Sequence, residues 1–419
     1  MADTRTGSVT NFDAWKHAYA ARAANLSVSE VRALFSVVSR PEVVSLAGGM
    51  PDVSALNGEL IEQAFQSMMS NRRNYALQYG GGQGDLRLRE QIQEIMALDG
   101  VHGSVEDLMI TTGSQHALEL IADLFLDQGD VVLVEAPSYV GAVGIFRHKE
   151  AHIEHVYTDD EGISPEALAE AADRLTESGH KVKMLYLVPN FANPSGVTLT
   201  EARRKKVLEV CKERGILIVE DNPYGLLYFE EKPPLALRSM DDENVVYLGS
   251  FSKILSPGLR VGYVLAPPAI REKLVLANES AILSPATFAQ MLVSEYLSLT
   301  DWQGQIDTYR ALYKQKRDAA LEGLKQYLPR VQTTRPNGGF FLWLTLPEGL
   351  NSKEMLPLAV NELVAYTPGT AFYGDGRGAN NIRVCYSHPT ADNVKVGIKR
   401  LSNVINLQLD LLETFGGKE

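Results

Sequence analysis

Short apolar runs alternate with amphipathic helical patterns from about Asp107 onward, and this order constrains the fold more than any other feature. LMITT, SQHALELIADLF and VVLVEAP follow one another in the order of a β-α-β unit. Four further runs are rich in β-branched residues and end in polar or turn residues: MLYLVPN from Met184, ILIVEDN from Ile216, VVYLGSF from Val245 and VGYVLAP from Val261. Such runs are typical of buried parallel strands. The sequence therefore predicts an α/β fold with a mostly parallel sheet.

The length of the chain, 419 residues, suits a large domain with a smaller companion. From about Pro285, helical patterns are followed by the strand-like runs GGFFLWLTL and NIRVCYS, which indicate a second, α+β domain. We expect residues 1–60 to form an N-terminal arm and part of the small domain. Residues 61–290 would form the large domain and residues 291–419 the C-terminal small domain.

Charge and cysteine content exclude several classes of protein. The formal net charge of -12 disfavours binding to nucleic acid or to anionic membranes. The two cysteines, Cys211 and Cys385, lie in a helical and a strand-like pattern and do not resemble a disulfide framework. The N-terminus lacks the pattern of a secretory signal, and no apolar run is long enough to span a bilayer. We therefore expect a cytoplasmic protein.

Lys253 is the first candidate for chemistry, because ligands of such sheets bind beyond the carboxyl ends of the strands. It follows an apolar strand pattern, where partial desolvation can lower the pKa of an amine and make it a nucleophile. Alone, it would be better explained as a surface lysine with a packed stem. Ser250, Ser252 and Arg260 are its neighbours, however, and their hydroxyls and guanidinium suit a phosphate. The alternative for these three is a pair of strand-end serines and a structural ion pair.

A second candidate anion site lies where a helical pattern begins at Ser114 and Gln115, directly after LMITT and Gly113. Free backbone N–H groups and the positive end of the helix dipole converge at such a position. The simpler alternative is that Ser114 only caps the helix.

Polar and aromatic residues follow three other strand patterns. Asp221 closes ILIVED and Tyr224 follows it, so a carboxylate could keep a pyridine nitrogen protonated while a phenol bonds a ring oxygen. A turn with an Asx-type cap would explain the same pair. Tyr139 could stack on a heterocycle or simply pack. Asn193 lies in a loop that turn chemistry alone would explain.

Three histidines, His148, His152 and His155, are close in sequence and raise the question of a metal site. The pattern changes from helix to strand between them, so their side chains need not share a face. We therefore expect no metal ion.

Nine motifs together identify a family. They are SLAGGMPD, ALQYG, TTGSQHALEL, EAPSYVG, VPNFANPSG, VEDNPYGLL, LGSFSKILSPGLRVGY, PNGGFFLW and NIRVCYS. In these motifs, their order and their spacing, the sequence resembles the class I and II aminotransferases of fold type I, which depend on pyridoxal 5'-phosphate (PLP), along nearly its whole length. The resemblance implies a large PLP-binding domain over residues 61–290.

The resemblance also implies roles for the residues above. Lys253 would be the Schiff-base lysine and proton shuttle, Asp221 would bind the pyridine nitrogen, and Asn193 and Tyr224 would bind the phenolic oxygen. Tyr139 would stack on the ring. The phosphate would be bound by Ser114, Gln115, Ser250, Ser252 and Arg260.

For the substrate, the resemblance implies that Arg383 binds the α-carboxylate with two hydrogen bonds, that Asn193 also contacts it, and that Gly49 is a substrate-binding residue. Tyr79 matches a tyrosine that reaches cofactor and substrate across a subunit interface, so a homodimer with shared active sites is implied. Within the family the likeness is to α-aminoadipate, kynurenine and branched-chain or aromatic transaminases, judged from the segment around Arg32. Arg32 would help to position the substrate side chain, or it is an exposed charge on an N-terminal helix.

The implied function is transfer of an amino group from an L-amino acid to a 2-oxo acid, with 2-oxoglutarate as the expected acceptor, in a ping-pong reaction. Two other functions stay open at this point. A PLP-dependent lyase or racemase would use the same lysine, aspartate and phosphate site. A regulatory protein could use the fold to sense a ligand, but fewer than fifty residues precede SLAGGMPD and the acidic charge disfavours DNA.

Overall fold

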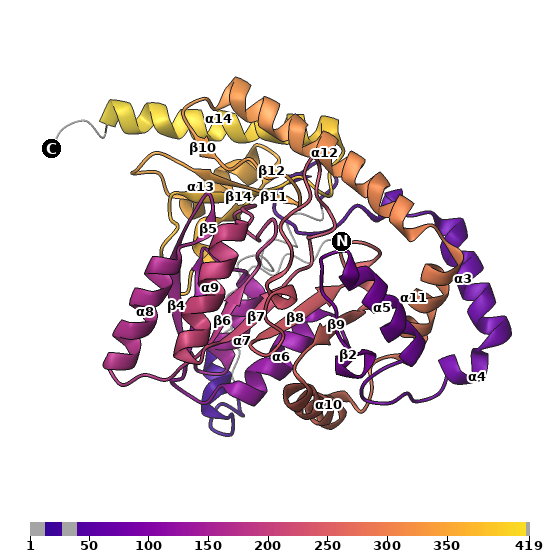
Figure 1. Ribbon diagram of the computed structural model, residues 1–419. Coiled ribbons are helices and arrows are strands. Elements are labelled where there is room, and N and C mark those ends of the chain that lie inside the picture. The colour runs from indigo at the N-terminus through magenta and orange to yellow at the C-terminus, as the bar shows by residue number, and fades with distance from the viewer. Residues whose placement is uncertain (1–12, 27–39, 416–419) are drawn as a thin grey trace.

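The computed structural model describes residues 13–26 and 40–415, and an eight-stranded sheet forms its centre (Figure 1). The strand order is β2-β9-β8-β7-β6-β3-β4-β5. The strands are β2 (Leu108–Thr111), β3 (Val131–Ala136), β4 (His152–Asp159), β5 (Gly162–Ile163), β6 (Val182–Leu187), β7 (Leu217–Asp221), β8 (Val245–Ser250) and β9 (Gly262–Leu265).

Strand directions make this sheet mixed and mostly parallel. Strands β4, β3, β6, β7 and β8 run parallel to one another, whereas β9 is antiparallel to both β8 and β2. The short strand β5 pairs with β4 in the antiparallel direction. The α/β fold with a mostly parallel sheet is therefore confirmed.

Helices cover both faces of the large sheet because successive strand residues point to opposite sides. Val132 and Val134 pack with helices on one face, while Val131 and Leu133 pack with helices on the other. The first face carries α6 (Ser114–Phe125), α7 (Val140–His148) and α10 (Pro268–Ile282), and the second carries α8 (Pro165–Glu177) and α9 (Glu201–Arg214). This double cover explains why the central strands β3, β6, β7 and β8 are mostly apolar.

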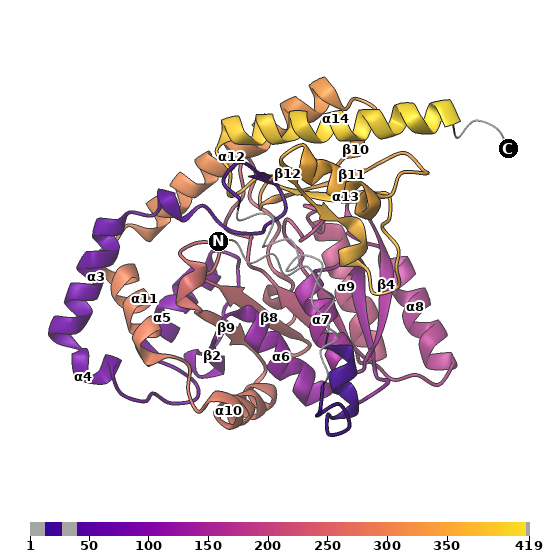
Figure 2. The ribbon, with the colours of Figure 1, turned by 180° about the vertical axis from the view of Figure 1, so that it is seen from behind.

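A smaller unit lies beside the large sheet under two long helices (Figure 2). Its four-stranded antiparallel sheet has the order β10-β11-β14-β13, and a parallel pair, β1 with β12, lies beside it. These elements are β1 (Val44–Ser45), β10 (Gln332–Thr333), β11 (Phe341–Thr345), β12 (Val364–Ala365), β13 (Thr367–Pro368) and β14 (Asn381–Cys385), with helices α12 (Trp302–Tyr327), α13 (Ser352–Asn361) and α14 (Ala391–Phe415). Segments from both ends of the chain thus meet in one unit; the expected domain boundaries at residues 60 and 290 stay predictions.

The remaining helices pack against the β2 edge of the large sheet. They are α3 (Gly58–Asn71), α4 (Arg73–Ala76), α5 (Leu86–Ala97) and α11 (Thr287–Leu299), and they share a core with β2, β8 and β9. Across the described ranges, no helix has both the length and the apolar character that crossing a membrane requires. Both cysteines are buried and free.

Candidate active site

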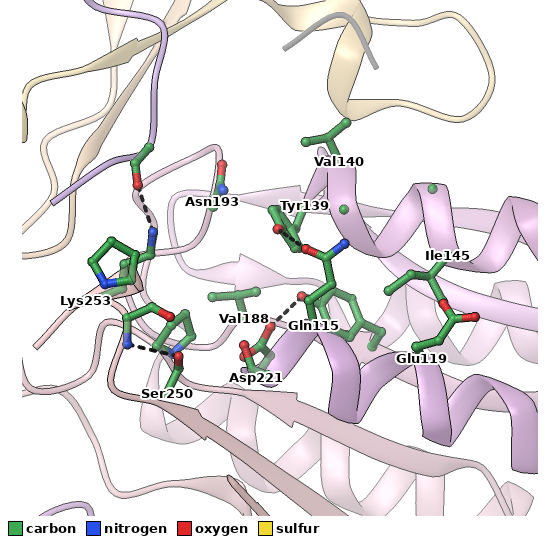
Figure 3. Close-up of a pocket in the computed structure, with 18 of the residues that line it drawn as sticks. Gln115, Glu119, Tyr139, Val140, Ile145, Val188, Asn193, Asp221, Ser250 and Lys253 are labelled. Atoms are coloured by element: carbon green, nitrogen blue, oxygen red, sulfur yellow. Dashed lines mark hydrogen bonds between the residues drawn. The ribbon is translucent and has the colours of Figure 1, made fainter. Parts of the chain in front are cut away.

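A pocket of about 750 Å³ lies at the carboxyl ends of the central strands, between the large sheet and the smaller unit (Figure 3). Twelve of the residues singled out from the sequence line it. They are Gly49, Ser114, Gln115, Tyr139, Asn193, Asp221, Tyr224, Ser250, Ser252, Lys253, Arg260 and Arg383. Tyr79 does not line this pocket and is 76% exposed in the single chain. Arg32 lies outside the described residues.

Lys253 lies just beyond β8, and its amine points toward the segment that follows β1 (Figure 3). The Nζ atom donates a hydrogen bond of 2.7 Å to the carbonyl oxygen of Gly49. The aromatic rings of Tyr224 and Phe340 lie 6.0 and 5.7 Å from this nitrogen. Burial lowers the pKa of the Lys253 amine to about 8. A substantial fraction of the amine is therefore unprotonated, and nucleophilic, at slightly alkaline pH.

Asp221 ends β7 on the floor of the pocket, and its carboxyl group is only half satisfied. The Oδ2 atom accepts a hydrogen bond of 2.9 Å from the hydroxyl of Tyr186. The Oδ1 atom is buried and has no hydrogen-bond partner within the described part of the chain. Burial raises the pKa of Asp221 to about 6. Because buried polar atoms without partners are rare, Oδ1 is suited to a ligand that donates a proton there.

Arg383 projects from β14 into the same pocket and is almost fully buried. Its Nη1 atom donates to Asn193 Oδ1 at 2.8 Å, and the guanidinium stacks between the rings of Phe341 and Phe372. Among residues 13–26 and 40–415, no carboxylate pairs with it and its Nε atom has no partner. A buried cation without a counter-ion is costly, so this guanidinium is suited to an anionic ligand.

A cradle for a second anion forms where α6 begins. Gly113 adopts a left-handed backbone conformation with φ of 81° just before the helix. A Cβ atom at Gly113 would lie 2.4 Å from Arg260 Nη2, so only glycine lets that guanidinium approach. Arg260 also lies 3.5 Å from the hydroxyl of Ser252 through Nη1. The free N–H groups of the α6 N-terminus and this guanidinium together suit a phosphate.

Two polar residues that line the pocket were missed by the sequence interpretation, namely Glu119 of α6 and Tyr186. Tyr186 belongs to β6, is fully buried and lines the pocket beside Asp221. A signal was present, because a tyrosine inside an otherwise aliphatic strand needs a partner for its hydroxyl. The three histidines lie apart: His148 lines the pocket from α7, His152 stacks on His180, and His155 accepts a hydrogen bond from the backbone of Gly374.

The groups that line this pocket match the chemical needs of PLP. A half-satisfied acid, an amine and an anion cradle lie around one pocket, as the ring nitrogen, aldehyde and phosphate of the cofactor require. The fold and the site together define a PLP-dependent enzyme of fold type I.

Comparisons with known proteins lead to the family. The model of the family "Aminotransferase class I and II" matches residues 41–401. The chain is 38% identical to aromatic-amino-acid aminotransferase 1 of Thermococcus litoralis, over 93% of this chain and 94% of that protein. It is 36% identical to the 2-aminoadipate transaminase of Thermus thermophilus, over 95% and 99% of the two chains. The chain therefore belongs to the class I and II aminotransferases.

A solved structure agrees with this assignment. Kynurenine aminotransferase of Pyrococcus horikoshii superposes with a TM-score of 0.89 at 39% identity, covering 93% of this chain and 97% of that chain. PLP is the cofactor typical of the family. The pocket residues described above are chemically suited to bind it.

Proposed function

We propose that this enzyme transfers the amino group of an L-amino acid of the aromatic, aminoadipate or branched-chain type to a 2-oxo acid, with 2-oxoglutarate as the acceptor, in a ping-pong reaction. The observation that carries the proposal is the meeting of the Lys253 amine, the Asp221 carboxyl and the buried Arg383 guanidinium in one pocket. The names of the relatives support the donor class, since they act on aromatic amino acids, 2-aminoadipate and kynurenine.

Each group of the pocket has a part in holding the cofactor. Lys253 would attach PLP through its amine, Asp221 Oδ1 would accept a hydrogen bond from the ring nitrogen, and Tyr139 would contact the ring. Tyr224 and Asn193 would bind the phenolic oxygen. The phosphate would be bound by residues at the start of α6 and beyond β8, namely Ser114, Gln115, Ser250, Ser252 and Arg260.

When bound, PLP supplies an electron sink for the charge that develops at the substrate α-carbon. The Lys253 amine holds the proton that leaves this carbon and returns it. An amine with a pKa of about 8 suits that task, because it both accepts and releases a proton near neutral pH. The Gly49 carbonyl at 2.7 Å orients the amine.

Arg383 and Asn193 bind the α-carboxylate of the substrate. The guanidinium fork can place two parallel hydrogen bonds on a carboxylate, which fixes the orientation of the bonds at the α-carbon. The rings of Phe341 and Phe372 hold the fork in position and exclude water from it. Gly49 approaches the same carboxylate from the segment after β1.

Lys253→Ala tests the central assignment. We expect the absorbance of the covalently attached cofactor to disappear and turnover to stop, because no other lysine of the described residues lines the pocket. Lys206→Ala, which removes an exposed lysine of α9, serves as the control and should leave both signals unchanged. Turnover by the Lys253→Ala protein at the wild-type rate would exclude the assigned role.

A donor screen tests the reaction type and the substrate class. Aromatic amino acids, 2-aminoadipate and leucine, each offered without acceptor, should convert the bound cofactor stoichiometrically to its pyridoxamine form. Addition of 2-oxoglutarate should then restore the starting spectrum. Release of ammonia instead would indicate a lyase, and loss of optical activity would indicate a racemase. Arg32→Ala should weaken acidic or kynurenine-like donors selectively, and an equal loss for all donors would exclude that role.

We further propose that the enzyme is a homodimer with shared active sites. Tyr79 is exposed in the single chain, and so are apolar side chains of the neighbouring helices, Phe65, Tyr75 and Phe288. A hybrid experiment tests this arrangement. Lys253→Ala and Tyr79→Ala proteins, each of low activity, should regain activity when their subunits are exchanged, because one site of each hybrid is then intact. A mixture that stays inactive after verified exchange would exclude shared sites.

A further inference from the structure

Tyr186 lies in the middle of the large sheet with its side chain against the pocket. It belongs to β6, next to β7, which ends in Asp221. Its ring packs edge-on against Phe146 of α7, with the ring centres 5.8 Å apart, so the ring has little freedom to turn. The side chain is fully buried, and the hydroxyl is its only polar atom.

The hydroxyl of Tyr186 binds one oxygen of the Asp221 carboxyl group and leaves the other oxygen available to a ligand. Oδ2 accepts a hydrogen bond of 2.9 Å from the phenol, which leaves the buried Oδ1 without a partner. A hydrogen bond to one oxygen fixes the rotation of the carboxyl group, so the free oxygen keeps one position. No ion pair within the described ranges involves Asp221, and Tyr186 is the one side chain there that donates to it.

This hydrogen bond also favours the charged form of Asp221. Burial alone raises the pKa of the carboxyl, and the bond from Tyr186 acts in the opposite direction. The pKa of Tyr186 itself is well above its ordinary value, because burial, the charge of Asp221 and the hydrogen bond to it disfavour the phenolate. The phenol therefore remains a donor over the whole working range of pH.

We infer that Tyr186 is a positioning residue that keeps Asp221 ionised and aims its free oxygen at the ring nitrogen of the cofactor. This inference rests on the proposed function of Asp221. One proton is shared between the ring nitrogen and the carboxyl group, and it lies on the nitrogen only while the carboxylate is the weaker base of the two. Without the phenolic hydrogen bond the carboxylate becomes more basic, and the proton moves toward Asp221.

A purely structural role for Tyr186 predicts something different. Replacement by phenylalanine keeps the contact with Phe146 and removes one buried hydrogen bond, so stability alone would change. Tyr366 offers a matched case, because it is fully buried and its hydroxyl donates to the Ser352 carbonyl at 2.6 Å without lining the pocket. Tyr366→Phe is therefore the control for the loss of a buried phenolic hydrogen bond.

The experiment measures the nitrogen-15 chemical shift of the cofactor ring nitrogen in holoenzyme prepared with labelled PLP. Wild type and Tyr366→Phe should show a protonated nitrogen, and Tyr186→Phe should shift toward the unprotonated form. A second measurement uses a cofactor analogue with carbon in place of the ring nitrogen. With PLP, the amine-transfer half-reaction of Tyr186→Phe should be about tenfold or more slower than that of wild type, since hydrogen bonds to charged groups have this magnitude. With the analogue, the two proteins should be equal.

The outcomes separate this inference from the proposed function. If the ring nitrogen is protonated in wild type and Tyr186→Phe has the same nitrogen-15 chemical shift, the role inferred for Tyr186 is overturned. The role proposed for Asp221 then still stands. An unprotonated nitrogen in wild type overturns the role proposed for Asp221. If Tyr186→Phe does not fold, a ring-fluorinated tyrosine at position 186, which is a stronger donor, should move the shared proton further toward the nitrogen, and an unchanged nitrogen-15 chemical shift would overturn the inference.

Discussion

Glu135 and Asp221 are both buried carboxyl groups near the carboxyl ends of sheet strands, but only Asp221 lines the pocket. Glu135 is the second-last residue of β3. Its Oε2 atom accepts a hydrogen bond of 2.9 Å from the backbone N–H of Val188. Burial raises its pKa from 4.5 to about 8. Val188 lines the pocket, so Glu135 supports the wall of the site in its neutral form.

In the wild type, the free energy of unfolding should fall between pH 5 and pH 8, and in Glu135→Gln it should fall less over the same range. The folded protein keeps the Glu135 proton up to about pH 8, whereas the unfolded chain releases it near 4.5. Within this window the folded state binds more protons, so the free energy of unfolding falls as pH rises, by roughly 1.4 kcal/mol per unit at most. Glutamine cannot ionise and keeps an oxygen for Val188. Denaturant titrations at pH 5 and pH 8 measure the difference, and equal pH slopes for both proteins would contradict the prediction.

At the scale of elements, the approach of β9 to the start of α6 builds the anion cradle. A Cβ atom on Gly262 would lie 2.6 Å from the backbone carbon of Gly113 and from the backbone nitrogen of Ser114. Backbone atoms cannot move aside as the end of a flexible side chain can. Because Gly262 has no side chain, β9 can lie close to the α6 N-terminus, and this close approach sets the position of the helix end relative to Arg260.

Gly262→Ala should weaken PLP binding by about tenfold or more, because the displaced helix end can no longer direct its N–H groups at the phosphate together with Arg260. Titration of the cofactor-free protein with PLP, followed by absorbance, gives the affinity. Gly58→Ala is the control, since Gly58 begins α3 and a Cβ there would meet nothing within 4 Å. Equal affinities of Gly262→Ala and the wild type would exclude this role for the close approach.

Individual elements were more predictable than the contacts between them. The pattern SQHALELIADLF coincides with α6, and the runs from Ile216 and Val245 contain β7 and β8. The run from Met184 begins two residues after the start of β6. Periodicity reports burial, however, and not the direction of a strand, so the antiparallel pairing of β9 did not follow from it. The bond from Tyr186 to Asp221 depends on strand order, and the Gly49 carbonyl at Lys253 depends on the path of the whole chain.

At the scale of the whole molecule, the segment of residues 46–52 connects the smaller unit to the pocket. The backbone of Cys385 donates to the Leu46 carbonyl at 2.8 Å, and the Ser387 hydroxyl donates to the Met50 carbonyl at 2.6 Å. The same segment presents the Gly49 carbonyl to Lys253. Its position therefore depends on the smaller unit, although the amine that it orients belongs to the large sheet.

An ion pair between Lys316 of α12 and Asp52 holds the end of this segment. Lys316 Nζ lies 2.6 Å from Asp52 Oδ2 and donates to the Ser387 carbonyl at 2.8 Å, while the lysine side chain is only 1% exposed. Burial alone would raise the pKa of Asp52, but the hydrogen bonds from Lys316 and Ser54 lower it. Removal of one partner leaves the other charge without compensation, which is the costly case for such pairs.

Lys316→Met should therefore lower the free energy of unfolding by about 3 kcal/mol, and a double-mutant cycle with Asp52→Asn should show coupling of about 1 kcal/mol or more. The double variant loses less than the sum, because neither charge then remains alone. Denaturant unfolding of the four proteins measures the coupling. Lys205→Met, which breaks an exposed pair with Glu201 on α9, should change stability by less than about 0.5 kcal/mol. Additive losses in the cycle would mean that the two side chains stabilise the segment independently, through Ser387 and Ser54 rather than through each other.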